Sequence, residues 1–90
     1  MTRAQIHEQV VAILARLIPG VDPTLLAPDA SLRKSLAADS MDILNFVTAL
    51  HDELGIEVPE RDYARLDTLE GCVAYVDAAL ARAAQSPASP

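Results

Sequence analysis

Residues 36 to 54 read Leu36-Ala-Ala-Asp-Ser-Met-Asp-Ile-Leu-Asn-Phe-Val-Thr-Ala-Leu-His-Asp-Glu-Leu54, a short serine-bearing turn that opens directly into an amphipathic segment. At about 100° per residue, one sector of a helical wheel starting at Ser40 collects the large apolar side chains. They are Ile43, Phe46, Val47, Leu50 and Leu54. The spacing predicts a helix over residues 40–54 with one face buried in a core.

A second, partly apolar stripe lies on the opposite side of this predicted helix. It holds Met41, Leu44 and Thr48, with Asn45 and Asp52 beside them and Asp42 and Glu53 toward one flank. Single exposed hydrophobic residues are common on protein surfaces, so Met41 and Leu44 alone leave the interpretation open. A stripe of this kind rimmed by carboxylates also suits a helix that docks on a partner.

The charge distribution favours docking. Between residues 36 and 60 there is no Lys or Arg, and all seven basic residues of the chain, whose net charge is −6, lie elsewhere. The same stretch carries the carboxylates Asp39, Asp42, Asp52, Glu53, Glu57 and Glu60. A field of one sign speeds encounters with basic partners. Because no basic cluster exceeds Arg33-Lys34, we expect basic protein surfaces as partners, and neither nucleic acid nor membrane.

The turn Ala37-Ala-Asp-Ser-Met41 and the segment from Asp42 to Pro59 resemble the G-x-D-S-L stretch and second helix of the acyl carrier proteins. The similarity extends over roughly Ile6 to Leu80. It implies that Ser40 carries 4′-phosphopantetheine, donated by coenzyme A through a phosphopantetheinyl transferase, and that the arm's thiol holds acyl groups as thioesters. It also implies delivery to acyl ligases, synthases or transferases of a fatty acid, polyketide or specialised pathway.

The position of Ser40 suits this role on physical grounds as well. A phosphodiester at a helix start meets unpaired N–H groups and the positive end of the helix dipole, worth roughly 0.3–1 kcal/mol. The alternative is that Asp39 or Ser40 only caps the helix, since both residue types are preferred caps. The surrounding motif favours attachment at Ser40. We therefore predict Ser40 as the cofactor site and Asp39, Met41, Asp42, Leu44, Asn45, Thr48, Asp52 and Glu53 as the partner face.

Two residues depart from the family pattern. Ala37 replaces the usual glycine, which predicts a backbone that does not need positive φ there. Asn45 stands where a glutamate of the recognition helix is common, which weakens one salt bridge with partners. A specialised pathway with its own ligase or synthase is therefore plausible.

The sequence gives little support for catalysis or for metal binding. The only histidines are His7 and His51, and His51 would lie about 16 Å along the helix from Ser40. No G-x-S-x-G elbow and no metal-ligand spacing is present, so we expect a carrier without catalysis and without a metal. Two alternatives stay open: an aminoacyl or peptidyl carrier, whose G-G-x-S-L-type turn is less similar, and an unmodified helical interaction module.

Signals elsewhere in the chain predict three further helices. A capping box at Thr2 and Gln5 opens a helix over about residues 3–18, residues 60–66 allow a short helix, and Asp67-Thr68 caps the last one. The last helix has its core stripe at Leu69, Cys72, Val73, Val76 and Leu80. Residues 19–38 form a long connection with a short helical turn near residues 23–27, pinned to the core by Leu25, Leu26, Leu32 and Leu36.

These elements predict an all-α fold, a small four-helix bundle of three longer helices and one short one, with the long loop between the first and second. We expect one domain over residues 1–84 and a disordered tail over residues 85–90. The lone Cys72 belongs to the core. Since no uninterrupted apolar run approaches 18 residues and no signal-peptide core is present, we expect a soluble, cytoplasmic monomer.

Overall fold

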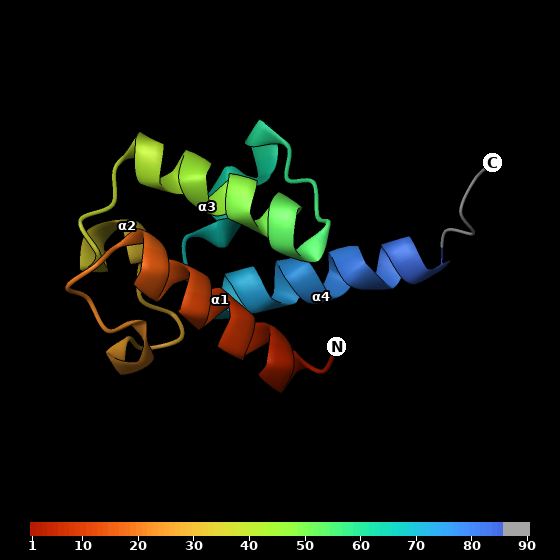
Figure 1. Cartoon of the computed structure of the whole chain (residues 1–90), viewed down its shortest axis with the longest axis horizontal. Coiled ribbons are helices and arrows are strands. Elements are labelled where there is room, and N and C mark those ends of the chain that lie inside the picture. The colour runs from red at the N-terminus through yellow and green to blue at the C-terminus, as the bar shows by residue number, and fades with distance from the viewer. Residues whose placement is uncertain (86–90) are drawn as a thin grey trace.

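The computed structural model of the chain describes residues 1–85, and the path of the chain is shown in Figure 1. In order, the elements are α1 (Arg3–Leu17), η1 (Pro23–Leu25), α2 (Leu32–Ser35), α3 (Ser40–Leu54), η2 (Glu60–Leu66) and α4 (Leu69–Gln85). This confirms the all-α bundle: α1, α3 and α4 are the longer helices, and the predicted short helix is η2, a 3₁₀ helix. Gln85 ends α4, and the rest of the predicted tail lies outside the described residues.

The helices begin and end where the sequence signals them. At the start of α1 the Gln5 N–H donates to Thr2 Oγ1 over 3.1 Å, and the Thr2 N–H donates to Gln5 Oε1 over 2.9 Å. At the end of α3, Gly55 has φ 69°, a left-handed conformation that glycine adopts without a side-chain clash. At α4, Thr68 Oγ1 accepts from the Gly71 N–H over 2.9 Å, which confirms that cap.

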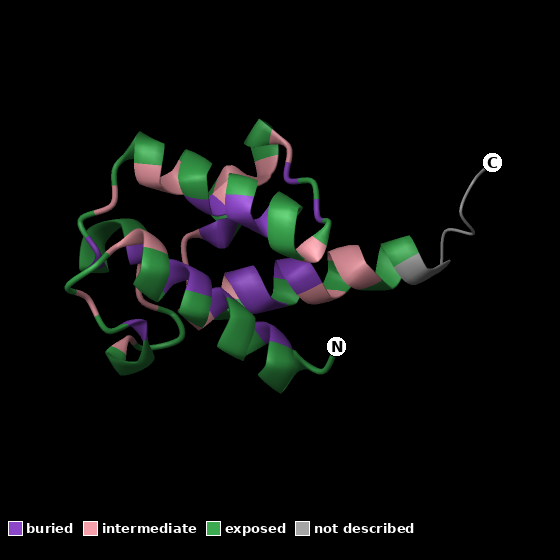
Figure 2. Cartoon of the chain, in the orientation of Figure 1, coloured by how far each residue is buried: buried purple, intermediate pink, exposed green. Residues whose placement is uncertain are grey.

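The core lies where α1, α3 and α4 face one another (Figure 2). The fully buried side chains include Ile6, Val10, Ile13, Leu50, Cys72 and Val76. Phe46 and Leu50 of the predicted α3 face are buried, whereas Ile43, Val47 and Leu54 are half-buried at its edges. Cys72 is a core residue as predicted: its Sγ donates to the Leu66 carbonyl over 3.1 Å, and burial raises its pKa to about 12.

The long connection is pinned to the core as predicted by Leu32 and Leu36, and Leu26 packs against it. The prediction for Leu25 is wrong, because its side chain is 81% exposed. It lies in the single turn η1, where Pro23 is the buried residue instead.

The sequence did not predict α2, a one-turn helix near the end of this connection. Its N-cap Ser31 accepts from the Lys34 N–H over 3.3 Å. The Leu32 N–H donates to the Asp67 carbonyl over 2.6 Å, and the Glu70 N–H donates to the Pro28 carbonyl over 3.1 Å. These bonds fix the second half of the connection against the junction of η2 and α4.

The prediction for Ala37 is wrong as well, because its φ is 51°. The physical reason is the end of α2: the Ala38 N–H donates to the Arg33 carbonyl over 3.0 Å, the bond of a Schellman motif, whose C′ residue is left-handed. Ala37 occupies that C′ position directly after the C-cap Leu36. The motif turns the chain from α2 into α3.

Candidate functional site

Ser40 is the first residue of α3, and its side chain is exposed. The cap belongs to Asp39, whose Oδ1 accepts from the Asp42 N–H over 3.0 Å, while Asp42 Oδ2 accepts from the Asp39 N–H over 3.1 Å. Of the two capping candidates, Asp39 therefore does the capping. In the described part of the chain the Ser40 hydroxyl has no hydrogen-bond partner, so it is available for modification.

Two backbone N–H groups beside this hydroxyl are also without an acceptor. The Ile43 N–H donates to the Asp39 carbonyl over 3.1 Å, and the Asp42 N–H is taken by the cap. Among residues 1–85 nothing accepts from the N–H groups of Ser40 and Met41. With the positive end of the helix dipole at the same place, these groups suit an anionic ester on Ser40. The site thus fits a phosphopantetheine phosphate.

The predicted partner face lies mostly on the outside of α3 (Figure 2). Met41 is 60% exposed and Leu44 is 46% exposed. Asp39, Asn45, Thr48, Asp52 and Glu53 are exposed too, and Asp42 is half-buried. We call Met41, Leu44, Asn45, Thr48 and Asp52 the α3 stripe. The Thr48 hydroxyl donates to the Leu44 carbonyl over 2.9 Å, so it is turned toward its own helix.

Glu53 is placed differently from what its sequence neighbourhood indicates. Its carboxylate forms an ion pair with Arg16 of α1, in which Nη1 lies 3.4 Å from Oε1. The fold therefore brings a basic residue to one of the six carboxylates of a stretch, residues 36–60, that itself contains no Lys or Arg. Since 37 residues separate the two partners, no local pattern could have shown this pair.

A groove extends the α3 stripe toward the end of the helix. Its α3 wall is Val47, Thr48 and His51, and the other wall is Ile56, Glu57, Val58, Pro59 and Arg61. Ile56 and Val58 are buried, so the groove is apolar at its floor. It lies beside residues of the predicted partner face, although the sequence analysis did not find it.

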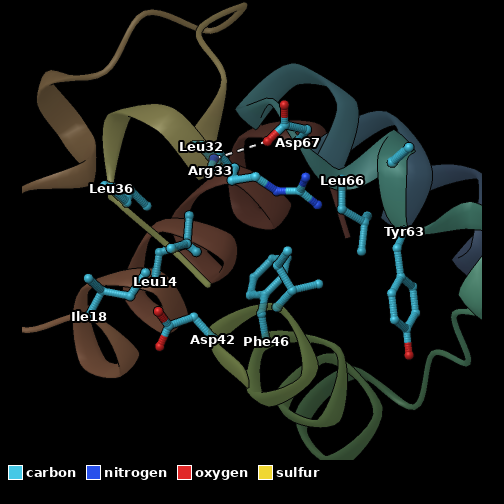
Figure 3. A pocket seen from close by; sticks show the side chains of 13 residues that line it. Leu14, Ile18, Leu32, Arg33, Leu36, Asp42, Phe46, Tyr63, Leu66 and Asp67 are labelled. Carbon is cyan, nitrogen blue, oxygen red and sulfur yellow. Dashed lines mark hydrogen bonds between the residues drawn. The ribbon is translucent and has the colours of Figure 1, made fainter. Parts of the chain in front are cut away.

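An apolar cavity of about 50 Å³ lies behind the first turns of α3 (Figure 3). Its lining comes from four elements: Leu14 and Ile18 of α1, Leu32 and Leu36 of α2, Ile43 and Phe46 of α3, and Tyr63 and Leu66 of η2. Asp42, in the same helical turn as Ser40, is also part of the lining. The cavity could not be predicted from the sequence, because its walls come from segments far apart in the chain.

Within the described residues, no group of three or more His, Cys, Asp or Glu side chains is arranged to hold a metal ion. His7 and His51 are exposed. None of the described helices has the length and apolar character needed to cross a membrane.

Comparison with known proteins identifies the family of the chain. Residues 8–76 match the family described as the phosphopantetheine attachment site. The acyl carrier protein of Thermosynechococcus vestitus is 34% identical over 77 residues, 86% of this chain and 94% of its own length. That of Rubrobacter xylanophilus is 34% identical over 76 residues, 84% of this chain and 93% of its own. That of Bdellovibrio bacteriovorus is 35% identical over 72 residues, 80% and 91% of the two chains.

The fold, the serine at the start of α3 and the family match define a phosphopantetheine-binding helical domain. The chain belongs to the acyl carrier protein family. The prosthetic group of this family is 4′-phosphopantetheine, as the resemblance of the sequence implied.

Proposed function

We propose that Ser40 is the attachment point of 4′-phosphopantetheine and that the protein is a non-catalytic carrier of acyl groups. The observation that carries this proposal is the start of α3, where Asp39 takes the cap and leaves the Ser40 hydroxyl exposed and unbonded in the described chain. When attached, the group supplies the thiol on which acyl groups are held as thioesters. Its donor is coenzyme A.

Formation of the ester requires a partner enzyme. The Ser40 Oγ forms the new bond to phosphorus, and the adenosine-bearing half of coenzyme A leaves. The serine proton passes to a base of the transferase, because no side chain within residues 1–83 hydrogen-bonds to Ser40. The N–H groups of Ser40 and Met41 face the negative charge that the ester adds.

The cavity supports acyl cargo over a purely polar one. Its lining is mostly aliphatic and aromatic, and Asp42 connects it to the turn that bears Ser40. Moving a methylene from water into such a site is worth about 0.8 kcal/mol. An acyl chain held from Ser40 is therefore stabilised when its end enters the space between α3 and η2.

The α3 stripe and the nearby carboxylates are the proposed docking face for the phosphopantetheinyl transferase and for acyl ligases, synthases or transferases with basic surfaces. Met41 and Leu44 supply an apolar contact, and Asp39, Asp42 and Asp52 supply negative charge around it. Glu53 contributes less than its neighbours because Arg16 already pairs with it. A cytoplasmic location is consistent with the single reduced thiol of Cys72.

Mass spectrometry tests the attachment directly. The protein is incubated with coenzyme A and a broad-specificity phosphopantetheinyl transferase, and one phosphopantetheine group is expected to be added. Ser40→Ala should abolish the addition, whereas Ser35→Ala, which removes another exposed serine just before the turn, should leave it intact. Modification that survives in Ser40→Ala would refute the assignment. A wild-type protein that stays unmodified would favour the unmodified interaction module.

A further inference from the structure

The carboxylate of Asp67 joins two walls of the apolar cavity. Asp67 follows η2, and its Oδ2 accepts from the Ser31 hydroxyl over 2.7 Å. Its Oδ1 accepts from the Arg33 N–H over 3.0 Å, the bond drawn as a broken line in Figure 3. Asp67 thus caps the start of α2 from 34 residues further along the chain.

Asp67 and Arg33, which share one of these bonds, both line the cavity. Leu32, Arg33 and Leu36 of α2 form one side, and Tyr63, Ala64 and Leu66 of η2 form another. The contact therefore spans the space between the two walls. We call the two side-chain bonds of Asp67, to Ser31 and to the Arg33 N–H, the Asp67 latch.

The α2 wall depends on this latch because α2 is too short to hold its own shape. It has four residues, and isolated helices far longer than one turn are only marginal in water. Apart from burial of Leu32 and Leu36, the start of α2 is fixed by the cap from Ser31, by the side-chain bonds to Asp67 and by the backbone bond from the Leu32 N–H to the Asp67 carbonyl. Hydrogen bonds to an ionised carboxylate are stronger than neutral ones, so the Asp67 latch is the main side-chain polar restraint on this wall.

We propose that Asp67 is a specificity-determining residue: its latch on α2 keeps the cavity near 50 Å³ and so limits the length of acyl chain that the carrier shields. A volume of this size is about a third of the roughly 150 Å³ of an engineered apolar cavity that binds one benzene molecule, so only the end of a short chain fits. Longer chains are shielded only after the latch opens and α2 moves away from η2. This inference rests on the proposed attachment of cargo at Ser40.

The first test compares chain lengths. Wild type, Asp67→Ala and Asp67→Asn are loaded with butanoyl, octanoyl or dodecanoyl groups from the matching acyl-coenzyme A, and thioester cleavage by hydroxylamine is timed. In Asp67→Ala the octanoyl and dodecanoyl esters are expected to be cleaved several-fold more slowly than in wild type, with little change for butanoyl. Asp67→Asn keeps an acceptor for the Arg33 N–H and should fall between the two.

Asp22→Ala is the matched control. Asp22 also caps a short helix, accepting from the Thr24 N–H over 3.0 Å, but it contributes nothing to the cavity lining. Its substitution should leave the dependence on chain length as in wild type. If Asp67→Ala changes all three esters by the same factor, or speeds cleavage of the longer ones, Asp67 has only a structural role and the proposal is overturned.

A second measurement uses the wild-type protein alone and so does not depend on how the variants fold. Hydrogen exchange of the Arg33 amide, which donates to Asp67, is compared between the butanoyl and octanoyl forms. Faster exchange in the octanoyl form is expected because the latch must open, and equal exchange contradicts the proposal. If no acyl group can be loaded on Ser40 in wild type, the proposed function fails instead.

Discussion

At the scale of the residue, Ala37 is a non-glycine residue in a backbone conformation that costs stability. Its φ of 51° is forced by the end of α2, where the Ala38 N–H returns to the Arg33 carbonyl. A non-glycine residue in the left-handed region is disfavoured by roughly 1–2 kcal/mol, because its Cβ approaches the following carbonyl oxygen. Glycine at this position would avoid that contact.

We therefore expect Ala37→Gly to stabilise the protein. The gain is offset by about 0.5–1 kcal/mol of extra chain entropy lost by glycine, so the free energy of unfolding should rise by up to about 1.5 kcal/mol. Urea denaturation measures it, with Ala27→Gly as the control, since Ala27 is an exposed loop residue without positive φ. A lower stability for Ala37→Gly than for wild type would show that the left-handed turn is not strained.

The residues whose placement was predicted are those governed by one periodic helix. Met41 and Leu44 are exposed and Phe46 and Leu50 are buried because a regular helix places them on opposite sides. The residues whose placement was not predicted depend on distant contacts. The φ of Ala37 and the exposure of Leu25 follow from short turns in the long connection, and the pairing of Glu53 follows from the packing of α1 beside α3.

At the scale of the element, the core face of α3 and its proposed docking face lie on opposite sides of the helix, and substitutions should separate their roles. Leu44→Arg should leave the free energy of unfolding within about 0.5 kcal/mol of wild type, because Leu44 is 46% exposed, while slowing modification of Ser40. Phe46→Ala should cost about 3–5 kcal/mol, because Phe46 is buried in the core. Thermal unfolding measures the stability of the two variants, and the transferase assay measures the rate of Ser40 modification. If Leu44→Arg unfolds the domain, the assignment of faces is wrong.

The stability that the contact of Asp67 with α2 contributes should depend on pH. Partial burial alone would raise the pKa of Asp67, but the bonds from the Arg33 N–H and Ser31, with the charges of Arg33 and Lys34, hold it below its ordinary value of 3.8. A carboxyl whose pKa is lowered by folding stabilises the fold at pH values above 3.8, and this contribution is lost as the pH falls through the lower folded value.

Urea denaturation at neutral pH and at about pH 3 tests this expectation. The lower pH is chosen because it lies below the ordinary Asp pKa of about 4. The free energy of unfolding of wild type should fall more on acidification than that of Asp67→Asn, because the variant has no carboxyl to protonate at this position. Other acidic groups titrate equally in both proteins, so the difference between them isolates Asp67. Equal losses would mean that the latch contributes no stability.

Long helices could be predicted from the sequence, and short ones could not be predicted fully. The three long helices each span several turns, so apolar spacing and end signals identified them. The four residues of α2 are too few to show a helical period, and its cap partner Asp67 lies far along the chain. The seven residues of η2 were predicted as a short helix, but so short a segment does not distinguish a 3₁₀ helix from an α-helix.

At the scale of the whole molecule, charge is distributed unevenly around the proposed site. The net charge is −6, and the carboxylates Asp39, Asp42 and Asp52 lie on α3 or at its start. Asp52 is exposed, and its Oδ1 lies 3.6 Å from His51 Nδ1. Asp42 differs because its carboxylate also accepts a hydrogen bond from the Asp39 N–H at the start of α3. Reversal of charge at the two positions should therefore have different consequences for docking.

We expect Asp52→Lys to slow the modification of Ser40 several-fold at low salt, because a rim charge acts mainly on the rate of association with a basic partner. The effect should shrink at high salt, since the Debye length is about 8 Å already at physiological ionic strength. Asp42→Lys should slow it further and keep part of its effect at high salt, because the bond from the Asp39 N–H to Asp42 Oδ2, one of the two bonds of the capping box, is lost as well.

Glu8→Lys is the control, because it makes the same change in net charge on an exposed residue of α1, whose N-terminal end is remote from the start of α3 (Figure 1). Its effect on the rate should be small at every salt concentration. Initial rates of phosphopantetheine transfer at low and high salt give the comparison. If Glu8→Lys slows the reaction as much as Asp52→Lys, net charge alone governs the encounter and the α3 stripe is not a docking face. If the rate stays measurable at high salt and is lower for Leu44→Arg, the part of the docking interaction that salt does not screen comes from the apolar side chains of the α3 stripe.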